Sequence, residues 1–388
     1  MSIVVGMLGL EARTITDQQI AQMFVLGFEG RHLTRSSSIV KDVCDRGLGG
    51  VILFKKNVQD RSQLRALTAQ LSQCKHWPLI AVDQEGGKVR RIRFGRDYPR
   101  AEEAVRMGTR RAAAMYDAMA QELHDLGINY NLAPVADLAT NPQNYIIAKL
   151  GRSYGRDPGT VTTYDTLFIR AMHRHKIATA LKHFPGHGSS RGDTHQGFVD
   201  VTQTWSPREL EPFWNSRADS VMIAHVVNDR IGDPGIPASL SPRAIQTLRR
   251  RRPHVVAITD DLQMGAIRKH YSLKETLRRA INAGNDLLLF GNQLSRDHRV
   301  TLTQLTGIVR QLIASGQVRP ATIQAANRRI ARLRRTIGAP RRTPTVSTPK
   351  RSVPHHRITT PRATSRPSKR HRRSTPAAAA LSEDGNMF

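Results

Sequence analysis

The chain has 388 residues, 39% of them hydrophobic, and the sequence contains no apolar run long enough to span a bilayer. This length can bury one large hydrophobic core, so a single enzyme-sized domain is the economical interpretation. The net charge of +29 predicts attraction to polyanions, but it indicates no particular catalytic chemistry.

The N-terminal segment MSIVVGMLGLEAR is apolar but lacks a basic lead and a small-residue cleavage site. We therefore expect no secretory signal and a cytoplasmic location. The two cysteines, Cys44 and Cys74, are too few for a disulfide framework and too far apart in sequence for a metal knuckle. We expect them to be ordinary thiols without a chemical role.

Short apolar runs alternate with amphipathic stretches, and each run is typical of a buried parallel strand. In chain order the runs are FVLGF from Phe24, GVILF from Gly50, LIAVD from Leu79, INYNLAPV from Ile128, ATALKHF from Ala178, SVMIAH from Ser220, VVAITDD from Val255 and DLLLF from Asp286. Eight such strands with helices between them predict an α/β fold, a (β/α)8 barrel of the TIM type.

Helix-start signals lie between the apolar runs. Ser206 is followed by Pro207 and Glu209 in the pattern of a capping box, and Ser241 precedes Pro242 in the same way. A helix after each strand makes the crossover connections of a parallel sheet, which places catalytic groups at the C-terminal ends of the strands.

The C-terminal part of the chain differs sharply in composition. Residues 339–388 are rich in Pro, Ser, Thr and Arg and contain little that could be buried. We predict a single catalytic domain over residues 1–338, followed by a disordered basic tail over 339–388. Nonspecific contact with polyanions through this tail is a further expectation.

Ionisable residues gather at the ends of the predicted strands. They are Asp83, Lys182, His183, His225, Asp260 and Asp261. Strand ends of a barrel often carry polar residues simply because they meet solvent, and each residue taken alone allows that interpretation. Their concentration on one predicted face favours a catalytic site.

Four segments carry a resemblance to a known family: AVDQEGGKVRRI from Ala81, LGRSYGRDP from Leu150, KHFPGHGSSRGDTHQG from Lys182 and ITDDLQMGAI from Ile258. They resemble glycoside hydrolase family 3, and within it the single-domain β-N-acetylglucosaminidases (β-hexosaminidases) of bacterial peptidoglycan recycling. The likeness runs from about Thr16 to Gly338. KHFPGHG is long and specific, whereas the other blocks gain their weight from order and spacing.

The resemblance implies a retaining glycosidase with Asp260 as nucleophile and His195, supported by Asp193, as acid/base. Retaining glycosidases commonly use a second carboxylic acid for proton transfer. Imidazole can replace it, because its pKa near 6.5 lets one ring give and take a proton near neutral pH while a carboxylate orients it. The alternative is a surface loop in which an Asp and a His happen to occur.

The resemblance also implies a ring of sugar-binding residues: Asp83, Arg91, Arg152, Lys182, His183 and His225. Hydroxyl-rich ligands require such convergent polar groups. Arg91 could instead belong to a generally cationic surface, and His225 could be a satisfied core histidine. His187 is expected to shape the loop through turn chemistry and not to touch sugar.

Two stretches depart from the family pattern. Ser189 and Ser190 stand where family members commonly carry Asp-Thr, although Asp193 and His195 keep their offsets. The stretch NPQNYIIAKL from Asn141 to Leu150 also differs from the family's approach to Arg152. The departures put the loop shape and the leaving-group specificity in question.

We predict removal of terminal β-linked N-acetylglucosamine, in particular from the muropeptide-derived disaccharide GlcNAc-anhydroMurNAc, with no metal or organic cofactor. One alternative is a metal-dependent hydrolase using His183, His187, His195 and Asp193, because imidazole and carboxylate suit zinc. Others are another family 3 β-glycosidase, a phosphorylase, or a barrel that binds polyanions nonspecifically. The sequence indicates no oligomeric state.

Overall fold

The computed structural model describes residues 14–74, 76–294 and 296–337. The N-terminal segment 1–13 and the basic tail 339–388 lie outside the described residues. The domain boundary at residue 338 and the disorder of the tail therefore stay predictions.

Each of the eight apolar runs contains a strand of one parallel sheet. In chain order these strands are β1 (Phe24–Gly27), β2 (Gly50–Leu53), β3 (Leu79–Val82), β6 (Tyr130–Asn131), β7 (Ala178–Phe184), β9 (Ser220–Ile223), β11 (Val256–Thr259) and β12 (Leu288–Phe290). They lie in the order β11-β9-β7-β6-β3-β2-β1-β12. A parallel bridge between Ile258 and Leu287 brings β12 back to β11, so the sheet closes into the predicted barrel.

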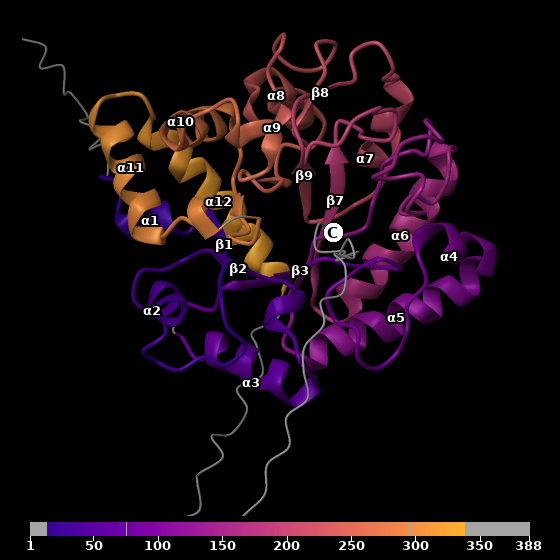
Figure 1. Cartoon of the computed structure of the whole chain (residues 1–388), viewed down its shortest axis with the longest axis horizontal. Coiled ribbons are helices and arrows are strands. Elements are labelled where there is room, and N and C mark those ends of the chain that lie inside the picture. Colours follow the sequence, from indigo (N-terminus) through magenta and orange to yellow (C-terminus); the bar gives the residue numbers. More distant parts are fainter. Residues whose placement is uncertain (1–13, 75, 295, 338–388) are drawn as a thin grey trace, which may run out of the picture. The chain divides into compact units, whose positions relative to one another are not determined.

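Twelve α-helices accompany the strands in the described part of the chain. They are α1 (Asp17–Ala21), α2 (Ser38–Cys44), α3 (Arg61–Ser72), α4 (Ala101–Met107), α5 (Thr109–Asp125), α6 (Pro158–Arg174), α7 (Glu211–Asn215), α8 (Pro242–Arg251), α9 (Gly265–Arg268), α10 (Leu273–Ala283), α11 (Leu302–Ala314) and α12 (Pro320–Thr336). Figure 1 shows helices arranged around the central strands. Strands covered in this way are buried on both faces, which explains their continuous apolar sequences.

The predicted helix starts are confirmed. Ser206 accepts a hydrogen bond from the Arg208 N–H and begins a 3-10 turn, η2 (Pro207–Leu210), which leads directly into α7. The Ser241 hydroxyl accepts from the N–H of Ala244 at the start of α8.

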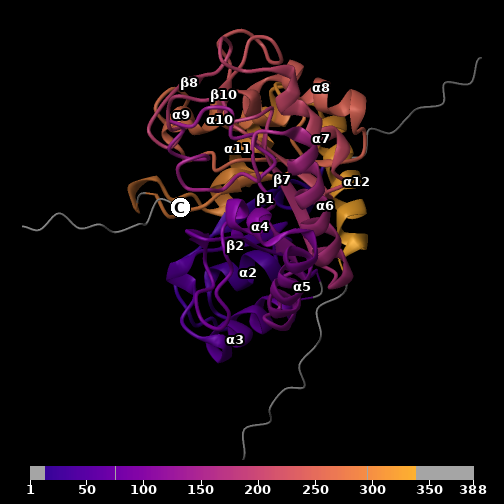
Figure 2. The ribbon, with the colours of Figure 1, turned by 90° about the vertical axis from the view of Figure 1, so that its right-hand side faces the viewer.

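Two short two-stranded sheets, which the sequence did not predict, stand at the C-terminal ends of barrel strands. β4 (Gln84–Gly86) and β5 (Val89–Arg90) form an antiparallel hairpin immediately after β3. β8 (Val199–Asp200) and β10 (Val226–Val227) pair in parallel. In Figure 2 the β8–β10 pair lies at the upper end of the molecule together with α9. These additions fix the loops that follow β3, β7 and β9.

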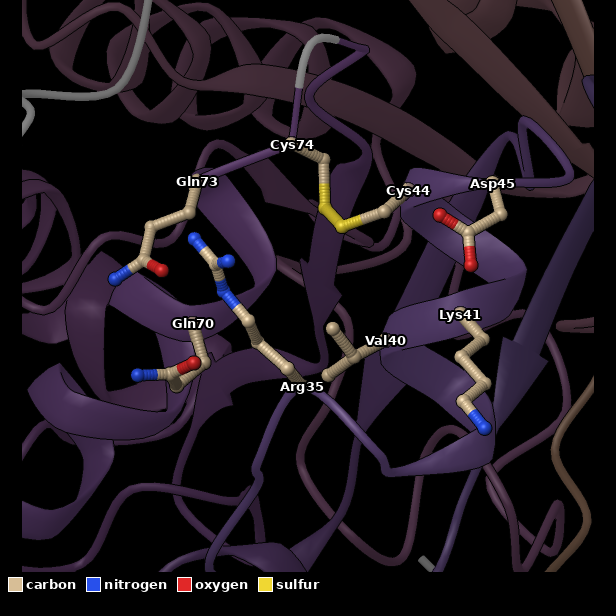
Figure 3. Close-up of a pocket in the computed structure, with 8 residues that line it drawn as sticks. All are labelled: Arg35, Val40, Lys41, Cys44, Asp45, Gln70, Gln73 and Cys74. Atoms are coloured by element: carbon tan, nitrogen blue, oxygen red, sulfur yellow. A yellow bond between two sulfur atoms is a disulfide. The ribbon is translucent and has the colours of Figure 1, made fainter.

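Cys44 and Cys74 form a disulfide, with their Cα atoms 4.8 Å apart, so the expectation of two ordinary thiols is wrong (Figure 3). Cys44 ends α2, and Cys74 follows shortly after α3. These two helices lead into the neighbouring strands β2 and β3, so their C-terminal ends meet on the same side of the barrel. Sequence distance alone concealed this proximity.

None of the helices in the described ranges combines the length and the apolarity needed to span a bilayer.

Candidate active site

The ionisable residues singled out in the sequence lie on one face of the barrel. Asp83 follows β3, Lys182 and His183 lie near the end of β7, His225 follows β9, and Asp260 follows β11. In a parallel barrel these C-terminal strand ends share one rim. The histidines His183, His195 and His225 are all close enough to Asp260 to affect its ionisation.

A chain of alternating charges crosses the rim from Arg91 to Arg152. Nη2 of Arg91 lies 3.0 Å from Asp83, and Nζ of Lys182 lies 2.8 Å from Asp83 and 2.6 Å from Glu85. Glu85 in turn accepts two hydrogen bonds of 2.8 Å from Arg152. The predicted residues Asp83, Arg91, Arg152 and Lys182 are thus in contact, joined by a glutamate that the sequence interpretation missed.

Mutual neutralisation keeps these buried groups ionised. Burial favours the neutral form of Asp83, but Lys182 and Arg91 outweigh it and hold the pKa of Asp83 well below its usual range. Burial opposes ionisation of Glu85 as well, yet Arg152 and Lys182 lower its pKa to about 2. The pKa of Lys182 is raised, because the two carboxylates overcome the effect of burial.

Asp260 and Asp261 are adjacent but have opposite environments. Burial raises the pKa of Asp260, but the three histidines and the N–H of Asp261 overcome this and hold it below the ordinary value. Burial raises the pKa of Asp261 to about 6, although Oδ1 of Asp261 accepts from the N–H groups of Gln263 and Gly291. Two neighbouring carboxyls with separated pKa values can fill different roles, and Asp260 is the one that stays ionised down to lower pH.

Asp193 and His195 form the pair expected from the motif. Oδ1 of Asp193 lies 2.8 Å from Nδ1 of His195 and also accepts from the His195 N–H at 2.9 Å. Burial lowers the pKa of His195, but Asp193 and Asp260 reverse this and raise it above the ordinary value. The ring is therefore oriented through Nδ1 and favoured in its protonated form.

Asp137, which the sequence interpretation missed, lies beneath the KHFPGHG motif and is completely buried. Its Oδ2 is 2.7 Å from Nδ1 of His183, and its Oδ1 accepts from the His187 N–H, also at 2.7 Å. Asp137 thus holds the backbone and a ring of the motif together. Its position shortly after the apolar run LAPVA was the available signal, the same one that identified Asp83 and Asp260.

His187 connects the motif to the dyad by hydrogen bonds. Its Nδ1 lies 2.9 Å from the Ser190 hydroxyl, and its Nε2 lies 3.3 Å from the hydroxyl of Thr194, between Asp193 and His195. Burial lowers the pKa of His187 to about 4, so the ring is neutral at neutral pH. This geometry supports the expected loop-shaping role. It also shows that Ser190, which departs from the family pattern, interacts with the ring of His187.

The divergent stretch from Asn141 to Leu150 packs against the same motif. The Asn144 side chain donates to the backbone carbonyls of His187, at 2.8 Å, and Gly188, at 3.2 Å. The carbonyl of Ile146 accepts from Nη1 of Arg152 at 3.1 Å. A Cβ on Gly188 would collide with the backbone carbonyl of Leu138, which explains the glycine at this position of the motif.

His225 is buried, and both its ring nitrogens have protein partners. Nδ1 lies 2.7 Å from the Ser239 hydroxyl, and Nε2 lies 2.9 Å from the backbone oxygen of Asp261. A sugar hydroxyl could reach either nitrogen only by displacing one of these partners. Of the two interpretations that the sequence allowed, this geometry favours the satisfied histidine.

Among the residues that the structure describes, no three His, Cys, Asp or Glu side chains are grouped so that they could hold a metal ion. The arrangement instead combines an ionised carboxylate, a carboxylate-oriented imidazole and a chain of fixed charges. Such a set can attack an electrophilic carbon, transfer a proton and bind hydroxyl groups.

The sequence also matches the "Glycosyl hydrolase family 3 N terminal domain" over residues 15–333. The chain belongs to glycosyl hydrolase family 3. It is therefore a glycosidase of a known family, which confirms the resemblance seen in its motifs.

Curated relatives in the family carry the name beta-hexosaminidase. The protein from Tolumonas auensis is 36% identical over 259 residues, which cover 63% of this chain and 76% of that protein. The one from Xylella fastidiosa is 33% identical over 284 residues, covering 69% and 82%.

Solved structures give the same result for the fold. A family 3 beta-N-acetylglucosaminidase from a Paenibacillus species superimposes with a TM-score of 0.76 at 28% identity, covering 87% of this chain but only 65% of that protein. A beta-N-acetylhexosaminidase from Beutenbergia cavernae has a TM-score of 0.70 at 26% identity, covering 83% of this chain and 98% of that one.

Proposed function

We propose that this glycosidase removes terminal, non-reducing β-linked N-acetylhexosamine with retention of configuration. The observation that carries the proposal is the pairing of an ionised Asp260 with His195, whose Nδ1 is committed to Asp193. The names of the relatives support the same sugar class.

In the first step the Asp260 carboxylate attacks the anomeric carbon while the bond to the leaving oxygen breaks. Protonated His195 gives its Nε2 proton to that oxygen, because Nδ1 is held by Asp193. In the second step neutral His195 takes a proton from water, whose oxygen attacks the anomeric carbon and releases Asp260. The imidazole ends protonated, as it began, so the cycle balances.

The fixed charges on the rim would bind the sugar. We assign Asp83 to accept hydrogen bonds from ring hydroxyls, and Arg91, Arg152 and Lys182 to donate to hydroxyl or acetamido oxygens. His183 can contribute through Nε2, since Asp137 occupies its Nδ1. We assign His225 a supporting role, because burial lowers the pKa of its ring and both ring nitrogens have protein partners, one of them the backbone oxygen of Asp261 next to the nucleophile.

The finer assignments follow from the motif resemblance. They are GlcNAc-anhydroMurNAc as substrate, a place in peptidoglycan recycling, and polyanion contact through the tail at 339–388. A cytoplasmic location stays a prediction, and the Cys44–Cys74 disulfide weighs against it, because cytosolic thiols are kept reduced. Phosphorolysis is the second candidate reaction, since the same glycosyl-enzyme could be attacked by phosphate in place of water.

The decisive test is nitrophenol release from the β-N-acetylglucosaminide by wild type, Asp260→Ala and His195→Ala, with EDTA present. The control is Asp125→Asn, which replaces an exposed carboxyl group on α5. We expect loss of activity in Asp260→Ala and, in wild type, a glycosyl adduct on Asp260 detected by mass spectrometry. Adding phosphate distinguishes the reactions, because a phosphorylase would release the sugar 1-phosphate.

Wild type that is inactive on this substrate and on the β-glucoside would contradict the proposal. Polyanion binding on a barrel scaffold would then be the leading function.

A further inference from the structure

The loop that carries Asp193 and His195 is docked on the short helix α9. We define the dyad loop as residues 188–198, between β7 and β8. Figures 1 and 2, viewed at right angles, both show β8 beside α9. α9 begins five residues after Asp260, so the helix under the loop belongs to the segment that presents the candidate nucleophile.

Two backbone hydrogen bonds attach the loop to the start of α9. The N–H of Gly265 donates to the carbonyl of His195 at 3.1 Å, and the N–H of Ala266 donates to the carbonyl of Thr194, also at 3.1 Å. The first N–H groups of a helix have no partner within the helix. Here the loop supplies acceptors for two of them, and one acceptor is on His195 itself.

Side chains just beyond α9 add two further contacts. Nζ of Lys269 donates to the backbone carbonyl of Gln196 at 2.7 Å. The ring of Phe198 meets the ring of His270 edge to face, with centroids 4.7 Å apart, although Phe198 is 42% exposed. In the part of the chain that the structure describes, Lys269 and His270 form no hydrogen bond or ion pair with the charged residues of the rim, so these contacts act on the loop.

The glycine at the first position of α9 is required by the loop. A Cβ on Gly265 would lie 2.6 Å from the carbonyl oxygen of His195 and 2.7 Å from that of Gln196. Its φ lies outside the left-handed region, so the backbone itself would accept alanine. Gly265 is therefore needed because the dyad loop approaches this position too closely to leave room for a side chain.

We propose that Gly265, Lys269, His270 and Phe198 form a latch that positions His195 against Asp260. They are positioning residues, because they act through the backbone of the dyad loop. The latch couples the two chemical groups through one short segment, so a shift of α9 moves the acid/base relative to the nucleophile. The inference deepens the proposed function and rests on its assignment of His195.

The first experiment measures the latch without using activity. Hydrogen exchange of the segment 262–270, and tryptic cleavage after the exposed Arg191 in the loop, are compared in wild type, Gly265→Ala, Lys269→Met and Phe198→Ala. Gly307→Ala on α11, where an added Cβ meets nothing within 4 Å, and Lys274→Met, which changes an exposed lysine on α10, are the matched controls. The latch variants should exchange and cleave at least about tenfold faster, and the controls should match wild type.

The second experiment isolates proton donation. A dinitrophenyl leaving group departs without protonation, whereas a sugar or methyl leaving group needs it. We expect the latch variants to lose at least about tenfold in kcat/KM on the N-acetylglucosamine disaccharide while changing less than about twofold on the dinitrophenyl glycoside, in the same direction as His195→Ala.

The outcomes separate the latch from the proposed function. Equal losses on both substrates, or unchanged exchange and rates in Gly265→Ala, would overturn the latch. If wild type hydrolyses neither substrate, the proposed function fails, and with it the positioning role, whatever the exchange shows.

Discussion

Arg152 holds Glu85 through two equal hydrogen bonds of 2.8 Å, and each side chain is only 8% exposed. Such bidentate pairing fixes the plane of both groups as well as their separation. Because Lys182 also contacts Glu85, this carboxylate links the arginine to the rest of the charged rim.

Glu85→Gln should destabilise the fold and weaken substrate binding. The amide keeps the shape but leaves the buried Arg152 without its counter-charge, which costs about 3 kcal/mol for a buried pair. Urea unfolding gives the stability, and KM for the nitrophenyl substrate should rise. Glu102→Gln, at an exposed pair with Arg106, should change stability by less than about 0.5 kcal/mol. Equal effects of the two variants would contradict the role of burial.

Asp193→Asn should move the alkaline limb of the pH–rate profile. His195 must be protonated for the first step, and Asp193 contributes to raising its pKa. Without that carboxylate the limb should shift to lower pH, so kcat/KM should fall most on the alkaline side of the profile. The acid limb, set by ionisation of Asp260, should stay in place. A profile that only scales down at every pH would argue against His195 as the titrating acid.

Glu209→Gln should change how stability depends on pH. Burial raises the pKa of Glu209 from 4.5 to about 7, so the folded chain binds this proton more tightly than the unfolded one. The resulting stability is fully present below pH 4.5 and is lost as pH rises through about 7. Glutamine cannot ionise, so the variant should gain most relative to wild type near pH 8, by about 3 kcal/mol.

Denaturant unfolding of wild type and Glu209→Gln at pH values on both sides of this window measures the difference. His187, with its pKa lowered to about 4, acts with the opposite sign in an overlapping range. The comparison of variants removes that contribution, because His187 is common to both. A difference that stays constant with pH would refute the assignment.

Asn144→Asp should disturb the catalytic loop while keeping the local turn. Oδ1 of Asn144 accepts from the N–H groups of Ile146 and Ile147, and aspartate preserves these acceptors. The donors to the His187 and Gly188 carbonyls are lost, and a carboxylate then faces two carbonyl oxygens. We expect a loss of about 2 kcal/mol in stability and a lower kcat. Asn282→Asp, whose amide donates to an exposed carbonyl, is the control.

Apolar runs were sufficient to predict the barrel, because a strand that is covered on both faces consists almost entirely of apolar residues. The ends of the strands were harder to predict, because the run INYNLAPV contains only the two-residue strand β6. The pairs β4–β5 and β8–β10 were missed, because strands of two or three residues are too short to show an alternation of apolar and polar residues. Their pairing depends on the barrel that places them together.

The candidate site was predicted residue by residue where a motif existed, as for Asp260 and His195. Glu85 was missed although it lies in the quoted segment AVDQEGGKVRRI, because a strand-end rule selects only Asp83. Asn144 was missed because its role depends on three-dimensional contact with the His187 loop. Residues that connect distant segments in this way form no spacing pattern in the sequence that could reveal them.

The Cys44–Cys74 bond joins residues 30 positions apart and so encloses β2 and α3 in a covalent ring. A protease that cuts once anywhere inside this ring would leave a single molecule under non-reducing conditions and two fragments only after reduction. Closing a ring of this size lowers the conformational entropy of the unfolded chain and so stabilises the folded state by about 3 to 4 kcal/mol. One complete strand–helix repeat of the barrel can therefore open only as a loop tied at its base, never as a free end.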